Sequence, residues 1–345
     1  MAKAMAAMSG GVDSSVVAVL LKNAGYQVLG GTLRLYDVNS EISPDIADAK
    51  SVCEKLNIPH FVFDLREEFE QSVISPFIDT YLSGGTPNPC TLCNRYIKFS
   101  GLLDCAQRAG ADYIATGHYA RIQKSGDRFL LCRAADKTKD QSYMLYSLSQ
   151  YQLAHTLFPL GELTKAQARE IAREYDLATA HKSDSQDICF VPDGNYAAFI
   201  ERHRGFTAQC GNFIDEMGNI LGHHKGVIRY TIGQRKGLGI ALGKPAFVLS
   251  KDALKNTVTL GGEPALFKKC VEVTDINLIP FDTLSSSIRV SAKLRYRHIE
   301  QPATLHSLDE NNVVIEFDEP QRAPSPGQAA VFYDGDTVIG GGTIK

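Results

Sequence analysis

The sequence has no apolar run long enough to cross a bilayer, and its first residues do not form a secretory signal. Only one lysine and a short Ala/Met stretch precede the glycines at positions 10 and 11. These absences exclude a membrane-spanning helix and a cleaved leader, so we expect a cytoplasmic protein with no membrane partner.

Clustered cysteine is missing as well. The eight cysteines are scattered over 345 residues, and only Cys90 and Cys93 lie close together. Secreted disulfide scaffolds are short and dense in cysteine, so this spacing excludes that class and favours reduced thiols, a few of them functional. The C-x-x-C pair alone is compatible with zinc binding, redox chemistry, an iron–sulfur cluster or two thiols with separate roles.

A strong net charge is also absent, because the chain carries only −3. Composition therefore does not indicate a nucleic-acid-binding protein. Residues 221–269, however, contain nine basic and two acidic residues, a local net charge of +7. Such a stretch is a candidate phosphate-binding surface, and a solvated face with countercharges elsewhere in the fold is the alternative.

The order of strand-like and helix-like segments divides the chain into three parts. Residues 1–204 alternate between the two, which predicts an α/β domain with a doubly wound parallel sheet. Residues 205–269 are rich in glycine and basic residues, and they predict a small β-containing domain. Residues 270–345 contain several short strand-like runs, which predict a C-terminal antiparallel β-barrel.

Two local signals stand out inside the first part. Residues 121–134 form two strand-like runs around Gly126 and Asp127, which predicts a β-hairpin. Thr164 and Gln167 have the spacing of a capping box, which predicts the start of a helix.

A glycine-rich turn, SGGVDSS at residues 9–15, follows the first predicted strand and opens the first predicted helix. Its glycines permit a tight turn, and backbone N–H groups at a helix N-terminus attract an anion such as phosphate. The Walker A pattern and G-x-G-x-x-G are both absent. Asp13 is unusual in a phosphate loop, and Mg²⁺ bridging to pyrophosphate would account for it. An ordinary strand–turn–helix with Ser14 as its cap is the alternative.

The S-G-G-x-D-S-S loop resembles the pyrophosphate loop of the ATP-pyrophosphatase (PP-loop) group, enzymes that adenylate a carbonyl or carboxyl oxygen and release pyrophosphate. Over nearly its whole length, and in order, the chain is similar to the bacterial and organellar tRNA-specific 2-thiouridylases. The stretches that carry this resemblance are TPNPCTLCNRYIKF, ATGHYAR, KDQSYMLY, SQDICFV, GVIRYTIGQRKGLGI, RYR and SPGQAAVFY. The resemblance implies a tRNA-uridine 2-sulfurtransferase that uses ATP and Mg²⁺ to make 2-thiouridine at the wobble position of tRNA.

The resemblance also implies which residues bind ATP, and it makes residues 1–204 the PP-loop ATP-binding catalytic domain. The implied ATP-binding residues are Met8, Ser9, Gly10, Gly11, Val12, Asp13, Ser14, Ser15, Leu33 and Gly117.

Three cysteines are implied to be catalytic. Transfer of AMP to the C2 oxygen of uridine makes that oxygen a leaving group, and a cysteine persulfide then supplies a reactive sulfur. By resemblance, Cys189 carries the persulfide and Cys93 releases the sulfur by attacking it and forming a disulfide. Cys90 departs from the family pattern, in which aspartate is usual and is thought to act in proton transfer. A thiol is neutral near pH 7 unless its pKa is depressed, so the role of aspartate cannot simply be carried over.

An alternative keeps all three cysteines at one site. Cys90, Cys93 and Cys189 would supply three thiolates to a [4Fe–4S] cluster with one iron open to bind a sulfide, as in related tRNA-thiolating enzymes of this fold. Structural zinc is disfavoured, because it requires four ligands and no fourth is evident. Unless the three cysteines bind such a cluster, we expect no metal ligands in the chain. Another adenylating PP-loop ligase would need neither the cysteines nor the basic middle part. A non-enzymatic redox or metal-binding module would leave the phosphate loop unexplained.

The expected partners are tRNA, held at its anticodon stem-loop, and a cysteine desulfurase or sulfur-relay protein that loads Cys189. Single-stranded bases are held by stacking and by hydrogen bonds to their edges, and Arg and Lys hold phosphates. By resemblance, the tRNA-binding residues are Asn88, Pro89, His118, Lys139, Asp140, Gln141, Arg295, Tyr296 and Gln328. Residues 205–269 are expected to form a central basic tRNA-binding domain with YTIGQRKGLGI, residues 230–240, at its centre, and replacing Lys or Arg in 225–236 by alanine is expected to weaken tRNA binding. A lone glutamine such as Gln328 is more often an inert surface residue.

Overall fold

The first part of the chain is built on a five-stranded parallel sheet. The computed structural model describes residues 1–36, 43–182 and 188–345. The sheet contains β1 (Lys3–Ala7), β2 (Gln27–Arg34), β3 (His60–Asp64), β4 (Tyr113–Ala115) and β7 (Thr156–Leu157). Its strand order is β3-β2-β1-β4-β7, and every pair is parallel.

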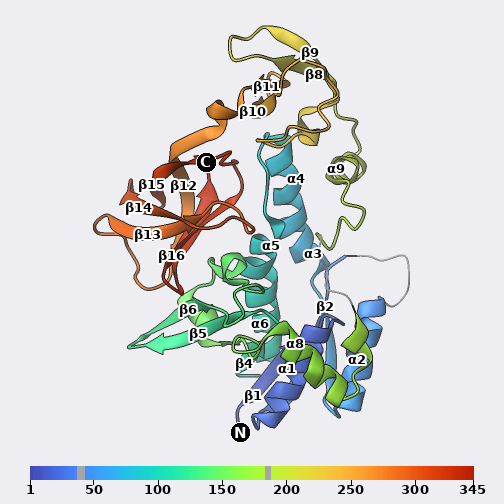
Figure 1. Cartoon of the computed structure of the whole chain (residues 1–345). Coiled ribbons are helices and arrows are strands. Elements are labelled where there is room, and N and C mark those ends of the chain that lie inside the picture. Colours follow the sequence, from blue (N-terminus) through green and yellow to red (C-terminus); the bar gives the residue numbers. More distant parts are fainter. Residues whose placement is uncertain (37–42, 183–187) are drawn as a thin grey trace.

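Helices cover both faces of this sheet. One apolar cluster packs α1 (Val12–Asn23), α2 (Pro44–Lys55) and α8 (Lys165–Glu174) against it, and a second cluster packs α6 (Leu102–Arg108). Figure 1 shows α1, α2 and α8 together beside β1 and β2. The predicted doubly wound α/β architecture is therefore confirmed. Thr164 caps α8 in the predicted capping box with Gln167.

Two long continuous helical segments, called rods below, connect the region of the sheet with the other parts of the chain. The first rod runs through α3 (Arg66–Phe69), the π-helical segment η1 (Glu70–Ile74) and α4 (Ser75–Leu82). The second begins at α5 (Pro89–Leu92), continues as the π-helical segment η2 (Cys93–Gly101) and ends as α6. π-helical turns are rare in proteins, and those that occur often lie at functional sites. Both cysteines of the C-x-x-C pair lie at the start of this second rod.

The predicted hairpin is present, but it belongs to another sheet. Its strands β5 (Ala120–Ser125) and β6 (Arg128–Arg133) pair with each other, and β6 pairs with β17 (Thr337–Ile344) of the C-terminal part. The smaller helical elements of the first part are η3 (Ser142–Leu145), α7 (Gln150–Ala154), η4 (Ala178–His181) and α9 (Tyr196–Arg204).

The middle part is a small four-stranded sheet with the order β10-β11-β8-β9. Its elements are β8 (Gly211–Ile214), β9 (Ile220–His224), η5 (Val227–Arg229), β10 (Phe247–Asp252), β11 (Thr257–Gly261) and η6 (Glu263–Leu266). Phe213, Val248 and Val258 are fully buried between these strands. Two of the pairings are antiparallel, and β8 runs parallel to β11.

The C-terminal part is a closed barrel, as predicted. Its strands are β12 (Phe267–Leu278), β13 (Ile288–Lys293), β14 (Gln301–Ser307), β15 (Asn312–Arg322), β16 (Ala329–Asp334) and β17. The order β12-β15-β14-β13-β16-β17 closes because β12 also pairs with β17. The proposed boundary at 269/270 falls just inside β12, and the division into three domains remains a proposal.

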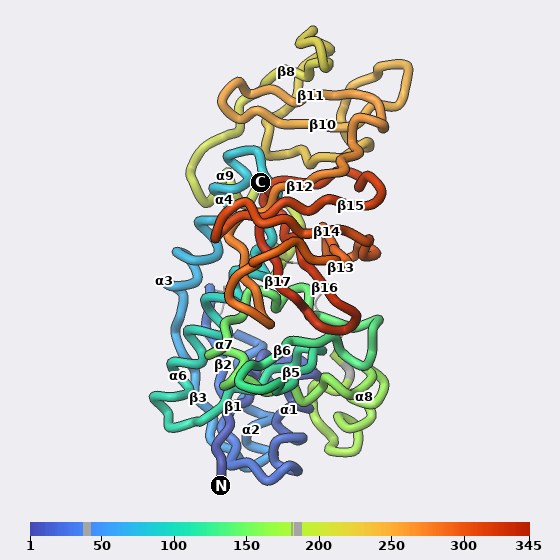
Figure 2. Tube along the Cα trace, turned by 90° about the vertical axis from the view of Figure 1, so that its left-hand side faces the viewer, coloured from blue at the N-terminus to red at the C-terminus, as the bar shows by residue number. Residues whose placement is uncertain are grey.

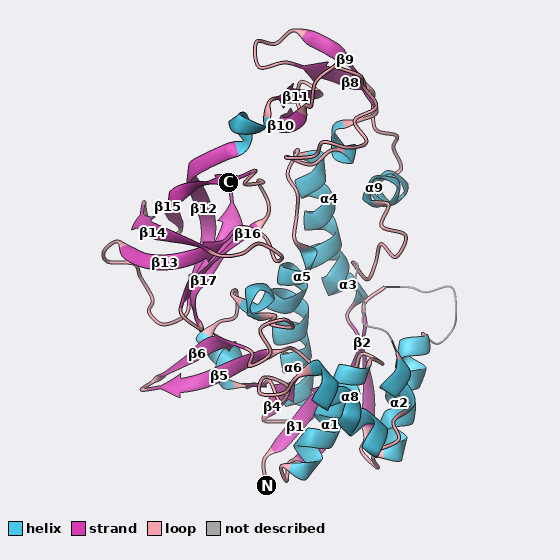
Figure 3. Cartoon of the chain, viewed as in Figure 1, coloured by secondary structure: helices cyan, strands magenta, loops and turns pink. Residues whose placement is uncertain are grey.

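The three parts lie along one axis. Figure 2 shows the α/β part at the N-terminal end, the barrel in the middle and the four-stranded sheet beyond the barrel. Figure 3 shows the difference in secondary-structure content, with helices concentrated in the first part and strands in the other two. The rod that ends in α4 runs alongside the barrel towards the middle sheet, so the turn after α4 lies where all three parts approach (Figure 1). No helix in the described ranges is both long and apolar enough to cross a membrane.

Candidate active site

The phosphate loop is a tight turn between β1 and α1. Gly10 has φ +69°, and a Cβ there would lie 2.6 Å from the carbonyl oxygen of Asp45, so both conformation and space require glycine. The hydroxyls of Ser14 and Ser15 donate to the Gly11 carbonyl oxygen, at 3.0 and 2.9 Å. The loop therefore directs backbone N–H groups at the N-terminus of a twelve-residue helix, an arrangement that binds phosphate.

Asp13, the unusual acid of this loop, is neutralised by protein groups. The Lys165 ammonium group lies 2.8 and 2.7 Å from its two carboxylate oxygens, and the Tyr119 hydroxyl donates to it at 3.0 Å. Magnesium is therefore not needed to explain why an acid stands here. Sequence reasoning missed both partners, because Lys165 looked like an ordinary helix residue within a capping box. No local pattern shows that α8 brings its first residue to the phosphate loop.

The other predicted ATP residues lie around the same loop. A Cβ on Gly117 would be 2.9 Å from the Asp13 Cβ atom, so the segment after β4 touches the loop closely. Met8 is buried, and its N–H donates to the Gly31 carbonyl oxygen on β2 at 2.8 Å. Leu33 lies further along β2 and is half-buried. Their contacts to ATP remain predictions.

The three predicted catalytic cysteines share one neighbourhood, although Cys189 is far along the chain. Cys93 is buried, whereas Cys90 and Cys189 are exposed, and all three are free thiols. Phe190 packs its ring against those of Phe69 and Phe77, with centroids 5.6 and 5.2 Å apart, and so fixes the segment after Cys189 on the first helical rod.

The pKa shifts of these thiols reflect their interactions with one another and with Lys98. Burial, opposed by the charge of Lys98 and reinforced by negative charge on Cys189 and Cys90, raises the pKa of Cys93 to about 12. Desolvation by the surrounding protein is the main cause of the raised pKa of Cys90 and of Cys189, and negative charge on Cys90 raises the pKa of Cys189 further. Lys98 opposes these effects at all three sulfurs. It stands five residues after Cys93, and sequence reasoning did not single it out.

The metal alternatives gain no support from this arrangement. Within residues 1–36, 43–182 and 188–345, no group of three or more His, Cys, Asp or Glu side chains is arranged to hold a metal ion. Neither the three-cysteine [4Fe–4S] cluster nor structural zinc therefore finds a ligand set among the residues that the structure describes.

His118 connects the two halves of the site. It follows Gly117 directly, and its ring lies against Phe99 of the cysteine-bearing rod with a centroid distance of 5.7 Å. Its Nδ1 atom is 2.8 Å from the Thr116 hydroxyl. Burial, followed by the charge of Lys98, holds the pKa of His118 well below its ordinary value, so the imidazole is neutral at physiological pH.

Several predicted tRNA residues already make contacts within the fold. The Asn88 side-chain amide lies 3.6 Å from the Met144 sulfur, and Pro89 is buried. Asp140 accepts a hydrogen bond from the Ser142 hydroxyl at 2.8 Å. Gln141 accepts from the Tyr119 N–H at 3.0 Å. Lys139, from the same segment, is half-buried. Whether these groups also contact tRNA remains a prediction.

The barrel contributes the remaining predicted tRNA residues. Tyr296 is exposed, and its hydroxyl donates to the Asp140 carbonyl oxygen at 3.2 Å, so the two predicted groups meet. Arg295 donates to Ser325, 3.2 Å away. Gln328 donates to the carbonyl oxygens of Thr86 and Pro87, at 2.9 and 3.1 Å. Gln328 is therefore not an inert surface residue, because it holds the loop that precedes Cys90.

The basic residues of the middle part do not form a uniform surface. Arg229 pairs with Glu201 at 2.7 Å, and Lys269 pairs with Glu316 at 3.2 Å. Lys251 points inward, whereas the other basic residues are exposed, among them Lys225, Arg235, Lys236 and Lys244. Countercharges elsewhere in the fold thus reduce the local excess that the sequence shows.

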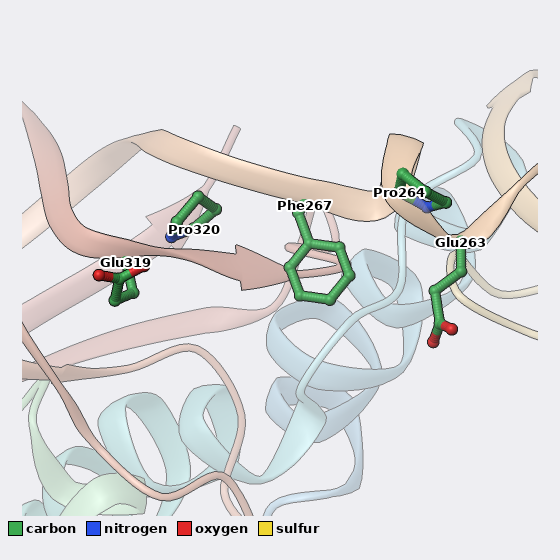
Figure 4. A pocket seen from close by; sticks show the side chains of 5 residues that line it. All are labelled: Glu263, Pro264, Phe267, Glu319 and Pro320. Carbon is green, nitrogen blue, oxygen red and sulfur yellow. The ribbon is translucent and has the colours of Figure 1, made fainter.

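Two open hollows lie in the middle and C-terminal parts. One, of about 730 Å³, is lined by Arg235 and residues 237–246, among them Lys244, so it suits an anionic chain. The other, of about 680 Å³, is lined by Phe267, two prolines and the acids Glu263 and Glu319 (Figure 4). With two carboxylates and no cation in its lining, this second hollow does not suit phosphate.

Known protein families match each part of the chain. A family model described as the tRNA methyl transferase HUP domain matches residues 2–193. One described as the tRNA methyl transferase PRC-barrel domain matches 197–262, and one described as the aminomethyltransferase beta-barrel domain matches 268–344.

Full-length relatives carry a different description. The tRNA-specific 2-thiouridylase MnmA of Clostridium botulinum (strain Alaska E43 / Type E3) is 47% identical over 352 residues, covering 99% of this chain and 98% of the relative. The protein of the same description from Clostridioides difficile (strain 630) is 48% identical, with the same coverage.

Solved structures are similar only at lower levels. The U34-tRNA thiolase NcsA from Methanococcus maripaludis, solved with its [4Fe-4S] cluster, is 18% identical, with a TM-score of 0.37 over 59% of this chain and 66% of that one. A 4-thiouridine synthetase solved with RNA and ATP is 15% identical, with a TM-score of 0.39 over 58% and 50%. Likeness at this level carries no argument about function.

Proposed function

The chain belongs to the family of tRNA-specific 2-thiouridylases, and from this premise we propose that it uses ATP to convert the wobble uridine of tRNA to 2-thiouridine. Family membership makes it a tRNA-modifying transferase of the PP-loop ATP-binding class. The proposal rests on one observation: the chain has both a phosphate loop and a site with three thiols, and two adjacent residues connect them. Gly117 touches the phosphate loop, and His118 packs against the cysteine-bearing rod.

The first proposed step is adenylation of the uridine. The C2 oxygen attacks the α-phosphorus of ATP, a bond from oxygen to AMP forms, and pyrophosphate leaves. The N–H groups at the start of α1 and the ammonium of Lys165 would stabilise the charge on the phosphates, since both lie at the loop. Mg²⁺ is commonly bound by one carboxylate together with substrate phosphates, so Asp13 would hold the Mg²⁺ that accompanies ATP once the phosphates draw Lys165 away from its carboxylate. Bound there, the ion would neutralise phosphate charge.

The second proposed step is sulfur transfer. The terminal sulfur of a Cys189 persulfide attacks C2, and AMP leaves with the C2 oxygen. Cys93 then loses its proton and attacks the Cys189 sulfur, breaking the bond to the transferred sulfur, which stays on C2. A Cys93–Cys189 disulfide forms, and a thiol reductant must return it to two thiols before a cysteine desulfurase or relay protein loads Cys189 again. The closeness of the two cysteines supports this step.

Cys90 is proposed to act in proton transfer. Desolvation by the surrounding protein raises its pKa, so it stays a protonated thiol at neutral pH and would take part in proton transfer where the family usually has aspartate. It is exposed at the start of the second rod, beside the two sulfur-transfer cysteines.

The tRNA is proposed to lie across the three parts. Its flipped uridine would meet Asn88 and Pro89 beside Cys90, while Tyr296, Asp140 and the exposed basic residues of the middle part hold the anticodon stem-loop. Lys225, Arg235 and Lys236 are proposed to neutralise phosphates, so their replacement by alanine should weaken binding and flatten its salt dependence.

Reconstitution tests the proposal. Anaerobically purified protein is incubated with ATP, Mg²⁺, an unmodified tRNA transcript, a cysteine desulfurase with cysteine, and a thiol reductant. Nucleoside analysis should then show 2-thiouridine, with one AMP and one pyrophosphate released for each thiolation. Active protein that contains iron and acid-labile sulfide would support the cluster alternative. Release of AMP without 2-thiouridine would point to another adenylating ligase.

A further inference from the structure

The loop that leads into the cysteine-bearing rod is held by all three parts of the chain. Residues 84–88 follow α4, and the Thr86 N–H donates to the Pro326 carbonyl oxygen of the barrel part at 2.7 Å. Gln328, from the same segment, donates to the next two carbonyl oxygens of the loop. From the other side, the Lys251 ammonium group donates to the Gly85 carbonyl oxygen at 3.2 Å.

Lys251 connects this loop to the middle part. It lies on β10, and its ammonium also donates to the Tyr230 carbonyl oxygen at 2.8 Å. Tyr230 directly follows η5, whose Ile228 is buried in the same apolar cluster as Phe77 of α4. One cation therefore joins β10, the η5 segment and the loop before Cys90.

The surroundings of Lys251 differ from those of its neighbours. In the described part of the chain no carboxylate pairs with it, whereas Lys255, on the same hairpin, is exposed and lies 3.7 Å from Asp252. Removal from water, with no acid to offset it, lowers the pKa of Lys251 to about 8. Desolvating an ammonium costs free energy, which the bonds to two carbonyl oxygens offset in part.

The loop needs such an anchor because two glycines begin it. Gly84 has φ +90°, a conformation that glycine adopts easily, and a Cβ built there would lie 3.5 Å from the Lys251 carbonyl oxygen. Glycines adopt many conformations when nothing fixes them, and the residues that follow them here are Asn88, Pro89 and Cys90.

We infer that Lys251 is a positioning residue: by bonding to Gly85 and Tyr230 it holds residues 84–88 so that Cys90 meets its reaction partners, and it links the middle part to that site. The inference rests on the proposed sulfur-transfer function for its consequence in catalysis. Lys251 therefore does not belong to the phosphate-binding surface that the local charge of +7 suggests.

The test compares Lys251→Met with Lys251→Arg and with the matched control Lys255→Met, all in the full chain. Hydrogen–deuterium exchange of the peptide covering residues 84–90 should speed up about tenfold in Lys251→Met, equivalent to the loss of one or two charge-assisted hydrogen bonds. Lys251→Arg, which keeps the charged donor, should restore most of the protection, and Lys255→Met should match the wild type.

Thiolation kinetics separate positioning from tRNA binding. In Lys251→Met, kcat should fall about tenfold while the Kd for tRNA changes less than about twofold. Unchanged exchange of 84–90, or a weakened Kd with unchanged kcat, would overturn the inference. If Lys251→Met does not fold, Lys251→Gln, which removes the charge but keeps a donor, takes its place in the exchange measurement. Exchange of 84–90 that is faster than in Lys251→Arg then supports the inference, and equal exchange overturns it. If the wild type makes no 2-thiouridine, the proposed function fails, and the exchange measurements still judge Lys251.

Discussion

The phosphate loop and the cysteine site are built in opposite ways. The loop closes its own hydrogen bonds within residues 9–15 and lies between a strand and the helix that follows it. The cysteine site depends on residues that are far apart in the chain, namely Cys90 and Cys93, the Cys189 segment, Lys251 and Gln328. A local motif can be judged from consecutive residues, whereas a composite site exists only after the chain has folded. The two sites should therefore fail separately when either is damaged.

The largest expected effect comes from mutating the two sulfur-transfer cysteines, which should stop thiolation but leave the phosphate loop working. Cys93→Ser and Cys189→Ser should each lower thiolation by on the order of 1000-fold or more, since a hydroxyl can neither carry nor release the sulfur. ATP–pyrophosphate exchange that depends on tRNA should persist. Cys270→Ser, an exposed cysteine outside every motif, is the control. Thiolation by Cys93→Ser at the wild-type rate would show that another group releases the sulfur.

Damage to the phosphate loop should give the reverse pattern. Lys165→Met removes the cation beside Asp13, and we expect adenylation to fall by about 100-fold, the usual effect of losing one preorganised charge. Persulfide formation on Cys189, followed by mass spectrometry, should not change. Lys137→Met, an exposed lysine that pairs with Asp336, serves as the control. Loss of persulfide loading together with adenylation would contradict the separation of the two sites.

A smaller effect is expected at the anomalous cysteine. Cys90→Asp, which puts the usual residue of the family there, should keep thiolation within about tenfold of the wild type, while Cys90→Ala should lose on the order of 100-fold, the typical contribution of a group that transfers a proton. Both rates come from nucleoside analysis of tRNA. Simultaneous loss of iron and activity in Cys90→Asp would identify Cys90 as a cluster ligand instead.

The smallest effect concerns charge at the thiols. Lys98 lowers the pKa of Cys90, Cys93 and Cys189, so Lys98→Met should raise all three further. Less thiolate then exists at any pH below those values, and alkylation of Cys189 by iodoacetamide between pH 7 and 10 should slow by up to about tenfold, equivalent to one pKa unit. The plot of the alkylation rate against pH should shift to higher pH without changing its shape. Lys50→Met is the exposed control, and an unshifted curve would remove Lys98 from the site.

Much of the architecture could be predicted because local patterns carried it. Alternating segments indicated the parallel sheet, regular short strands indicated the barrel, and Thr164 with Gln167 marked the start of α8. The hairpin around Gly126 was also recognisable, but its membership of the barrel sheet was not, since one pairing of Thr337 with Cys132 decides it. Pairing between segments two hundred residues apart leaves no local signal.

Consecutive residues alone were enough to specify the phosphate loop, the hairpin and the helix caps, because their hydrogen bonds run between near neighbours in the chain. The partner of Asp13, the anchor of the loop before Cys90 and the closeness of Cys189 to Cys93 arose from folding. The side chains concerned, Lys165, Lys251 and Phe190, act across contacts between elements, and only packing brings those elements together.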